Sequence, residues 1–174
     1  SKQILDDLVA LNQEGYFTIN SQPKVGGLPS EDPNFGWGAK GGKVFQKAYL
    51  EFFTSKDNLD RLVLRLDELN DISYQALNFD GDLISNLPEN NVNAVTWGVF
   101  PGQGILQPTI VDARSFLIWK DEAFGLWIND WASIYKTNSD SYNLLHQIHD
   151  THYLVNIVDN DFIDGNMIKH ILEK

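Results

Sequence analysis

The run from Val44 to Phe53 constrains the fold of this chain more than any other stretch. It is rich in the aromatic and β-branched residues that fit a pleated sheet, and its apolar residues fall on both alternating faces. A strand that is apolar on both faces is buried on both, so we expect it to be central in its sheet. A helix follows directly, with Thr54 or Ser55 as its N-cap. The apolar face of that helix carries leucines at helical spacing: Leu59, Leu62, Leu66 and Leu69.

The rest of the chain alternates between helical and strand patterns. Helical spacing from Ile4 to Leu11 ends before Gly15, and three more helices are predicted to begin at Asp112, at Ser139 or Ser141, and at Met167. The helix from Asp112 carries a stripe of rings, which is typical of a helix packed across a sheet; the stripe comprises Phe116, Trp119, Ala123, Trp127, Trp131 and Ile134.

Strands are indicated by runs of β-branched and aromatic residues bounded by turn residues. They are Tyr16–Asn20, Ile72–Phe79, Asn93–Phe100, Ile105–Val111 and Tyr153–Val158, with a turn at Asp80-Gly81 and a return strand at Leu83-Ile84. The segment from Pro23 to Gly42 is rich in Gly and Pro and predicts a long loop. This order predicts one α+β domain in which a mixed sheet, or more than one, is packed by helices. A chain of 174 residues is long enough to form one such core.

Charge and composition exclude several classes of function. The net charge is −11, which argues against binding to nucleic acid or to an anionic membrane surface. The chain has no cysteine, so disulfides and thiolate chemistry are excluded. It shows no signal peptide and no apolar run long enough to span a bilayer. It begins without Met, directly in a helical pattern, and we expect it to be part of a longer protein.

The strand that opens at Tyr16 ends abruptly in polar residues. Asn20, Ser21 and Gln22 supply a hydroxyl and two amides, and Pro23 stops the ladder. Such a strand end is able to hold a polar ligand at the edge of a sheet. An ordinary strand end followed by a turn uses the same residue types, and these residues alone do not separate the two interpretations.

Further neutral hydroxyls lie near strand ends, at Thr18, Thr96 and Thr109. Thr96 is expected on the Ala94 and Gly98 side of its strand, where small neighbours leave space for another group. Thr109 follows Pro108, which interrupts the ladder. This set suits the binding of a zwitterionic or nucleoside-like ligand without catalysis.

The sequence contains no constellation for catalysis or metal binding. His146, His149 and Asp150 have spacing that could place ligands on one helix face, with oxygens from Asp159, Asn160 and Asp161. We interpret them as a solvated helix face and an acidic turn, because neither a zinc-protease motif nor a calcium loop is present. The charged run Lys120-Asp121-Glu122 fits an exposed helix face with local ion pairs. No serine-nucleophile motif, dinucleotide fingerprint or P-loop occurs.

Taken whole, the chain resembles the C-terminal regulatory domain of eukaryotic methylenetetrahydrofolate reductase over nearly its full length. The resemblance is carried by long and unusual runs: Thr18–Pro23, Gly36–Gly38, Val44–Phe53, Asn93–Gly98, Gln107–Thr109, Trp119–Phe124, Leu154–Asn156 and Asp159–Phe162.

The resemblance implies a regulatory role. In that family an N-terminal barrel with FAD reduces methylenetetrahydrofolate to methyltetrahydrofolate with NADH or NADPH, a cytoplasmic step of one-carbon metabolism that serves methionine biosynthesis. The C-terminal domain is not catalytic and has no cofactor of its own. It binds S-adenosylmethionine, which inhibits the enzyme, or S-adenosylhomocysteine, which relieves inhibition. Its expected partners are its own catalytic domain and a second subunit of a homodimer.

The resemblance also implies which residues contact the effector. These are Thr18, Ile19, Asn20, Ser21, Gln22, Thr96 and Thr109, with Ser1 at the edge of a contact segment that lies upstream. Compared with the family, residues 1–174 start inside the regulatory domain, so an upstream acidic contact, part of the pocket wall, the linker and the catalytic barrel are expected to be missing. The alternative function is a dimerisation and scaffold module of the same enzyme that does not depend on the ligand.

Overall fold

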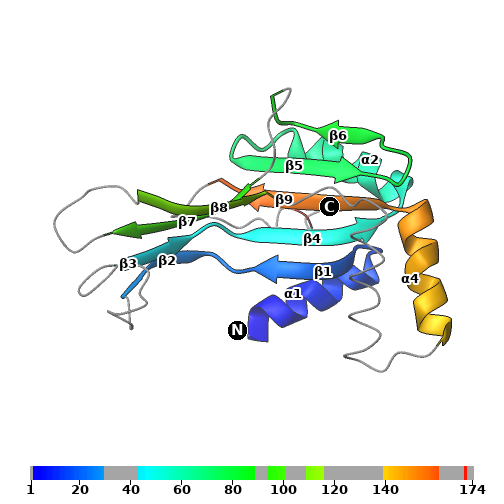
Figure 1. The fold of residues 1–174 in the computed structure, drawn as a ribbon, viewed down its shortest axis with the longest axis horizontal. Helices are drawn as coiled ribbons and strands as arrows, with labels where there is room; N and C mark the ends of the chain where they lie inside the picture. The colour runs from blue at the N-terminus through cyan, green and yellow to red at the C-terminus, as the bar shows by residue number, and fades with distance from the viewer. Residues whose placement is uncertain are drawn as a thin grey trace.

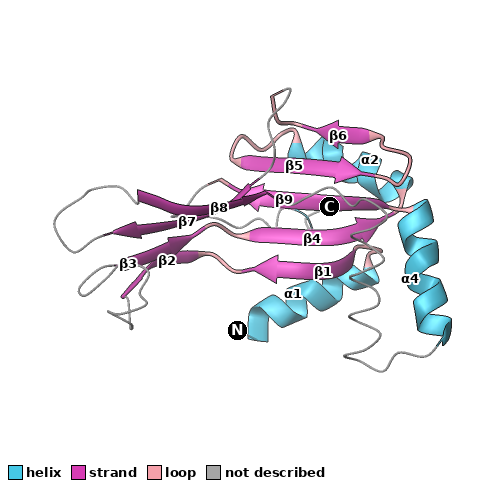
Figure 2. Ribbon diagram, viewed as in Figure 1, coloured by secondary structure: helices cyan, strands magenta, loops and turns pink. Residues whose placement is uncertain are grey.

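The computed structural model describes residues 2–29, 43–88, 94–100, 109–115, 139–160 and 171. Its strands form two sheets that follow one another along the longest axis of the molecule, with helices beside the larger one (Figure 1). Figure 2 shows the same arrangement by secondary structure, with helices and strands in separate colours. The α+β class predicted from the sequence is therefore confirmed.

The larger sheet has five strands in the order β1-β4-β9-β5-β6. Their bounds are β1 Phe17–Gln22, β4 Tyr49–Thr54, β9 Tyr153–Asp159, β5 Ile72–Leu77 and β6 Leu83–Ser85. Every pairing among these strands is antiparallel, whereas the sequence pattern predicted a mixed sheet. The direction of a neighbour depends on which distant segments pair, and a local pattern does not contain that information.

The smaller sheet has four strands in the order β2-β3-β7-β8, again with antiparallel pairings. Their bounds are β2 Val25–Pro29, β3 Lys43–Gln46, β7 Ala94–Phe100 and β8 Thr109–Ser115. Strand β2 corrects the loop predicted from Pro23 onward. The glycine-rich stretch pairs with β3 and shifts register between Gly26 and Leu28, and a glycine inside a strand often marks such a bulge.

Two helices pack against one face of the larger sheet. They are α1, Lys2–Gln13, and α2, Lys56–Leu66, and a third helix, α4, Ser139–Thr151, leads into β9. Their apolar residues meet alternate residues of β4, β5 and β9 in one buried cluster that includes Leu11, Leu50, Phe52, Leu59, Leu62, Leu66, Tyr74 and Val155. Ser55 is the N-cap of α2, as predicted, and its side chain accepts a hydrogen bond from the backbone N–H of Asn58.

The predicted long strand from Val44 to Phe53 is divided between the two sheets. Its halves are β3 and β4, and both are interior strands, so the prediction of a central position is confirmed for each. The break is at Lys47-Ala48, across from Pro23-Lys24, and we call these four residues the junction. Pro23 has no N–H to contribute to a ladder, and the Ala48 carbonyl accepts instead from the backbone N–H of Asp159, at 3.0 Å.

Asp112 is not a helix N-cap. It lies inside β8, where its backbone is opposite Trp97, because the ladder with β7 competes successfully with the local capping preference of Asp. Residues 116–134, the predicted aromatic helix, lie outside the described residues. So do Gly36–Gly38, residues 101–108 and, apart from Ile171, the predicted closing helix.

Candidate functional site

The predicted contact segment Thr18–Gln22 occupies β1, an edge strand of the larger sheet. Thr18 lies opposite Phe52 and Ser21 lies opposite Leu50, and both of these β4 residues have side chains in the helix-packed core. Residues directly opposite in an antiparallel pair share a face. The backbone therefore presents the Thr18 and Ser21 hydroxyls together, on the face of the sheet that α1 covers.

Thr18 is held by the end of α1. Its hydroxyl oxygen accepts from Asn12 Nδ2 at 2.6 Å, and its backbone N–H donates to Asn12 Oδ1 at 3.2 Å. The same Asn12 Nδ2 donates to the Leu8 carbonyl at 2.7 Å. Helix α1 thus fixes the start of β1, and a ligand that contacts Thr18 would lie next to α1.

Thr96 and Thr109 lie in the smaller sheet, on β7 and β8. Thr96 precedes Trp97, which is opposite Gln46, the last residue of β3 before the junction. Thr109 is opposite Val99, two steps farther along β7. Ser21 and Gln22 lie just before the junction on the neighbouring chain segment. The fold therefore brings the end of β1 and Thr96 toward one junction, while Thr109 is farther out along the smaller sheet; Ser1 lies outside the described residues.

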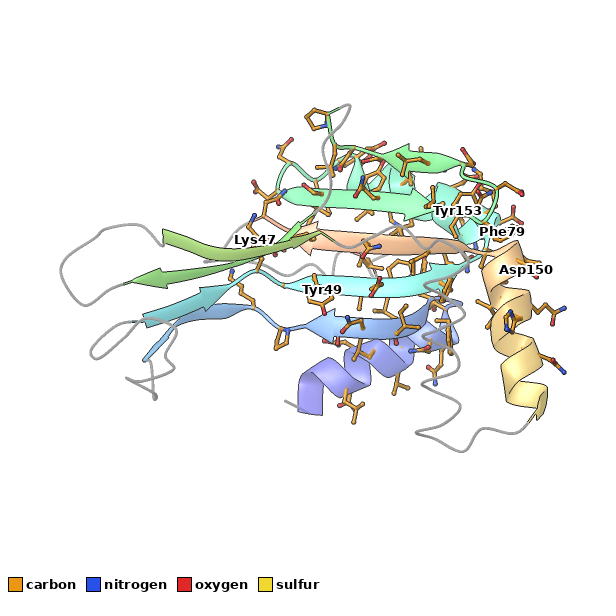
Figure 3. All side chains as sticks on the ribbon, in the orientation of Figure 1. Lys47, Tyr49, Phe79, Asp150 and Tyr153 are labelled. Atoms are coloured by element: carbon orange, nitrogen blue, oxygen red, sulfur yellow. The ribbon has the colours of Figure 1, made fainter. Side chains whose placement is uncertain are left out.

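Two lysines lie across from each other at the junction. The pairs Gln22–Tyr49 and Val25–Gln46 keep one register on its two sides, which places Lys24 opposite Lys47. Lys47, labelled in Figure 3, is half-buried, and its Nζ donates to Asn160 Oδ1 at 3.4 Å. Burial lowers the pKa of Lys47, and the nearby Asp159 carboxylate partly offsets this. Nζ of Lys24 is buried, and among the described residues it has no hydrogen-bond partner.

A row of polar side chains crosses the opposite face of the larger sheet. Asn20, Glu51, Asn156 and Gln75 lie directly across from one another on β1, β4, β9 and β5. Glu51, Asn156 and Gln75 are each at most 7% exposed. Burial raises the pKa of Glu51 to about 7, and a hydrogen bond from the Asn20 side chain acts in the opposite direction. Sequence reasoning missed Glu51, although a carboxylate inside the apolar run Tyr49–Phe53 was a signal that could have identified it.

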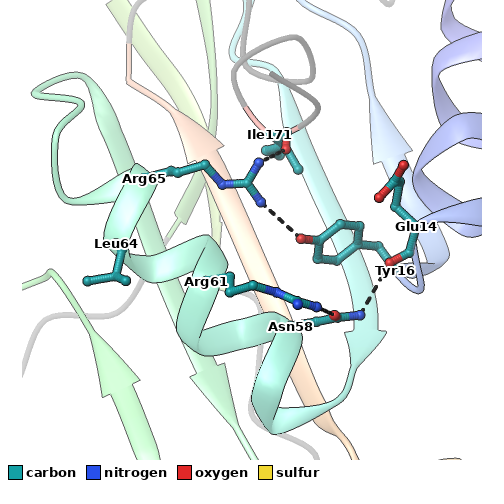
Figure 4. A pocket seen from close by; sticks show the side chains of 7 residues that line it. All are labelled: Glu14, Tyr16, Asn58, Arg61, Leu64, Arg65 and Ile171. Atoms are coloured by element: carbon teal, nitrogen blue, oxygen red, sulfur yellow. Dashed lines mark hydrogen bonds between the residues drawn. The ribbon is translucent and has the colours of Figure 1, made fainter. Parts of the chain in front are cut away.

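A separate cavity of about 510 Å³ lies between the end of α1, helix α2 and Ile171 (Figure 4). Arg65 donates to the Ile171 carbonyl at 2.8 Å and to the Tyr16 hydroxyl at 3.1 Å. Arg61 donates to Asn58 Oδ1. None of the predicted contact residues lines this cavity. Its arginine contacts connect three segments that are distant in the sequence, so we interpret it as a structural joint.

The described residues contain no group of three or more His, Cys, Asp or Glu side chains placed to hold a metal ion. His146 is half-buried and Asp150 is exposed on α4. Within the same residues, no helix is both long and apolar enough to cross a membrane.

Comparison with known proteins identifies the family. The model of the family described as "MTHFR, SAM-binding regulatory domain" matches residues 1–174, the whole chain. The chain belongs to this family of methylenetetrahydrofolate reductase regulatory domains. The recognition made from sequence runs alone is therefore confirmed.

Relatives with the reductase name come from plants, fungi and animals. The chain is 50% identical to methylenetetrahydrofolate reductase (NADH) 1 of Zea mays over 167 residues, covering 96% of this chain and 28% of the relative. It is 45% identical to methylenetetrahydrofolate reductase 1 of Schizosaccharomyces pombe over 171 residues, covering 98% and 28%. It is 42% identical to the probable methylenetetrahydrofolate reductase (NADPH) of Caenorhabditis elegans over 174 residues, covering 98% and 26%. The chain thus spans little more than a quarter of the length of these relatives.

Proposed function

We propose that this chain is the effector-sensing part of a methylenetetrahydrofolate reductase. It binds S-adenosylmethionine and S-adenosylhomocysteine and thereby controls the reduction of 5,10-methylenetetrahydrofolate to 5-methyltetrahydrofolate by an attached catalytic domain. The observation that carries the proposal is that the end of β1 and Thr96 both lie near one junction, in a chain that matches the SAM-binding regulatory family throughout. The reaction, with FAD and a nicotinamide cofactor, belongs to the catalytic domain. The relatives are named for NADH or for NADPH, so the choice of coenzyme stays open.

The chemistry of the predicted contacts suits the shared parts of the two effectors. Hydroxyls donate and accept, so Thr18, Ser21 and Thr96 are able to bind carboxylate, ammonium and ribose hydroxyl groups. Backbone N–H and C=O groups on the edge of β1 that pairs with no described strand supply further hydrogen bonds. Both effectors carry an amino-acid end and a ribose, so these contacts contribute affinity without separating the two.

Discrimination between the effectors requires a different contact. S-adenosylmethionine has a cationic sulfonium with an extra methyl group, whereas the sulfur of S-adenosylhomocysteine is neutral. The two are separated by shape and by charge, through carbonyls, carboxylates or an aromatic face near sulfur. Control of the enzyme then requires that the two ligands favour different arrangements of this domain relative to the barrel, because a ligand with equal affinity for both shifts nothing.

Calorimetric titration with both adenosyl compounds tests the proposal. We expect a protein that contains the whole regulatory domain to bind them, and Thr96→Ala to weaken binding by about tenfold or more through loss of one hydrogen-bonding hydroxyl. Titration of the 174-residue chain beside it shows how much of the pocket this chain supplies. Absence of binding by the longer protein would contradict the proposal and would favour a dimerisation and scaffold module.

A further inference from the structure

The hydroxyls of Thr18 and Ser21 share a face only because β1 is irregular. In a regular strand, side chains three positions apart point to opposite faces. The pairing with β4 changes register between Thr18 and Asn20, so that Ile19 is an extra residue. Thr18 and Ser21 consequently lie opposite Phe52 and Leu50, which are two positions apart and share the core face. The bulge is therefore a condition for presenting both hydroxyls together.

Contacts fix the bulge on both sides. On the side before Ile19, Asn12 binds the hydroxyl and the backbone N–H of Thr18. On the side after it, Asn20 is opposite Glu51, and its side chain hydrogen-bonds to the Glu51 carboxyl. Asn20 is itself exposed, whereas Glu51 is 7% exposed and lies in an interior strand. Glu51 is therefore the buried partner in this pair.

Burial of the ionised Glu51 carboxylate lowers the stability of the fold. A carboxylate that is removed from water loses solvation, and this loss lowers stability unless hydrogen bonds or a cation compensate for it. Its cross-strand neighbours, Asn20 and Asn156, are neutral amides, and its neighbours on the same face of β4 are Tyr49 and Phe53. Among the described residues, no basic side chain shares this face of β4 nearer than Lys47 at the junction. A buried carboxyl that has no close cation within the described part of the chain needs a reason other than stability.

We propose that Glu51 is a positioning residue for the effector site, which holds Asn20 and thereby the bulge that turns Thr18 and Ser21 to one face. This inference rests on the proposed function, since it concerns the same site. Glu51 lies on the opposite face of the sheet from the two hydroxyls, so it acts on them through Asn20 and the backbone rather than by direct contact. Its influence passes through the backbone of three consecutive residues, Ile19 to Ser21.

The position makes the site sensitive to pH. An ionised carboxylate accepts a stronger hydrogen bond from the Asn20 amide than a protonated one does. The Glu51 carboxyl changes ionisation near neutral pH, since burial raises its pKa to about 7. Effector affinity should therefore increase between about pH 6 and pH 8, and the change should disappear when residue 51 cannot ionise.

The test uses the full-length reductase that contains this domain, titrated calorimetrically with S-adenosylhomocysteine at several pH values from 6 to 8.5. We expect Glu51→Leu to weaken binding by about tenfold, a typical effect of losing one well-placed charged hydrogen bond. Glu51→Gln retains an acceptor for Asn20, so it should restore most of the affinity while abolishing the pH dependence. Glu68→Leu, at an exposed glutamate after α2, is the matched control and should leave affinity unchanged.

Asn20→Ala supplies a second arm, because Asn20 is exposed and its replacement is tolerated more easily by the fold. In a double-mutant cycle with Glu51→Leu, the losses in affinity should be clearly less than additive. Additive losses, or an unchanged affinity in Glu51→Leu, would overturn the positioning role while leaving the proposed function intact. Failure of the wild-type reductase to bind either adenosyl compound would overturn both.

Discussion

At the scale of single residues, a buried polar group such as Glu51 affects stability more than an exposed polar group does. Thr18, Ser21 and Thr96 were predicted from sequence because hydroxyls near strand ends are a recognisable pattern. Glu51 was not singled out, because its environment depends on three strands that are distant in the chain. The burial of Glu51 affects the free energy of unfolding in a way that depends on pH.

Glu51 should make the folded chain less stable at alkaline pH. Its pKa is raised to about 7 in the fold from an unfolded value of 4.5, so the folded state favours the protonated form. The resulting stability is fully present below pH 4.5 and is lost as the pH rises through about 7. A shift of this size corresponds to roughly 3 kcal/mol.

Glu51→Gln removes this pH dependence. We expect the free energy of unfolding of the variant to exceed that of the wild type by about 2–3 kcal/mol at pH 8, and the difference to shrink toward zero near pH 4.5. Urea denaturation at several pH values measures the two free energies. Glu68→Gln, at an exposed position, should show no such trend, and a difference that does not vary with pH would contradict the assignment.

At the scale of elements, most helices and strands follow from local patterns. The leucine face of α2 and its Ser55 cap are where the sequence predicted them, and Leu59, Leu62 and Leu66 are fully buried. Asp80-Gly81 turns the chain from β5 to β6, and Gly81 has a positive φ of 88°. The failures are Asp112 and the Gly26-Gly27 stretch, where a partner strand overrode the residues' own preference. A local pattern predicts an element correctly when the element's own residues determine its structure. It fails when pairing with a neighbouring strand determines the structure instead.

The end of α1 depends on Gly15. This residue has a positive φ of 92°, and a Cβ added to it would be 2.6 Å from Asn58 Nδ2. That amide donates to the Glu14 carbonyl at 3.3 Å and to the Gly15 carbonyl at 3.5 Å, and so connects α1 to the start of α2. Gly15→Ala should cost about 2–3 kcal/mol, from left-handed backbone strain and from displacement of Asn58.

Gly81→Ala is a matched control for this substitution. Gly81 has a similar φ of 88°, but an added Cβ would meet nothing within 4 Å. It should therefore cost only the backbone strain, about 1 kcal/mol. Thermal and urea unfolding of both variants separate the two contributions. Equal losses would show that the contact with Asn58 is unimportant.

At the scale of the whole molecule, the junction decides how the two sheets are related. The strand pairs β1–β4 and β2–β3 keep one register through it, so the two pairs form one long, interrupted two-stranded hairpin that belongs to both sheets (Figure 1). The predicted effector contacts lie in both sheets, on the two sides of the junction. A ligand that bridges the sheets would therefore be sensitive to their relative orientation, which is a property that a regulatory domain needs.

Lys24 should lower the stability of the junction. Its Nζ is buried and, within the described part of the chain, has no hydrogen-bond partner, and it lies opposite a second lysine. Lys24→Met keeps the length of the side chain and removes the charge, so we expect it to raise the free energy of unfolding by ~1–3 kcal/mol.

Urea denaturation at pH 7 checks this expectation. Lys56→Met is the control, since Lys56 is an exposed residue paired with Asp60 in the first turn of α2, and such a pair contributes about 0.5 kcal/mol or less. A loss of stability in Lys24→Met would mean that the ammonium already has a stabilising partner.

The sequence by itself determined the α+β class, the family, the central position of the run from Val44 to Phe53, and the leucine face of α2, because these depend on periodicity or on long continuous motifs. Only the tertiary structure decided that this run is divided between two sheets, that the sheets are antiparallel, and that an extra residue at Ile19 turns Thr18 and Ser21 to one face. Each of these depends on pairing between segments that are far apart in the chain. A strand's own residues show which side chains alternate between its two faces. Its partner sets the register, and the register determines which side chains lie next to one another.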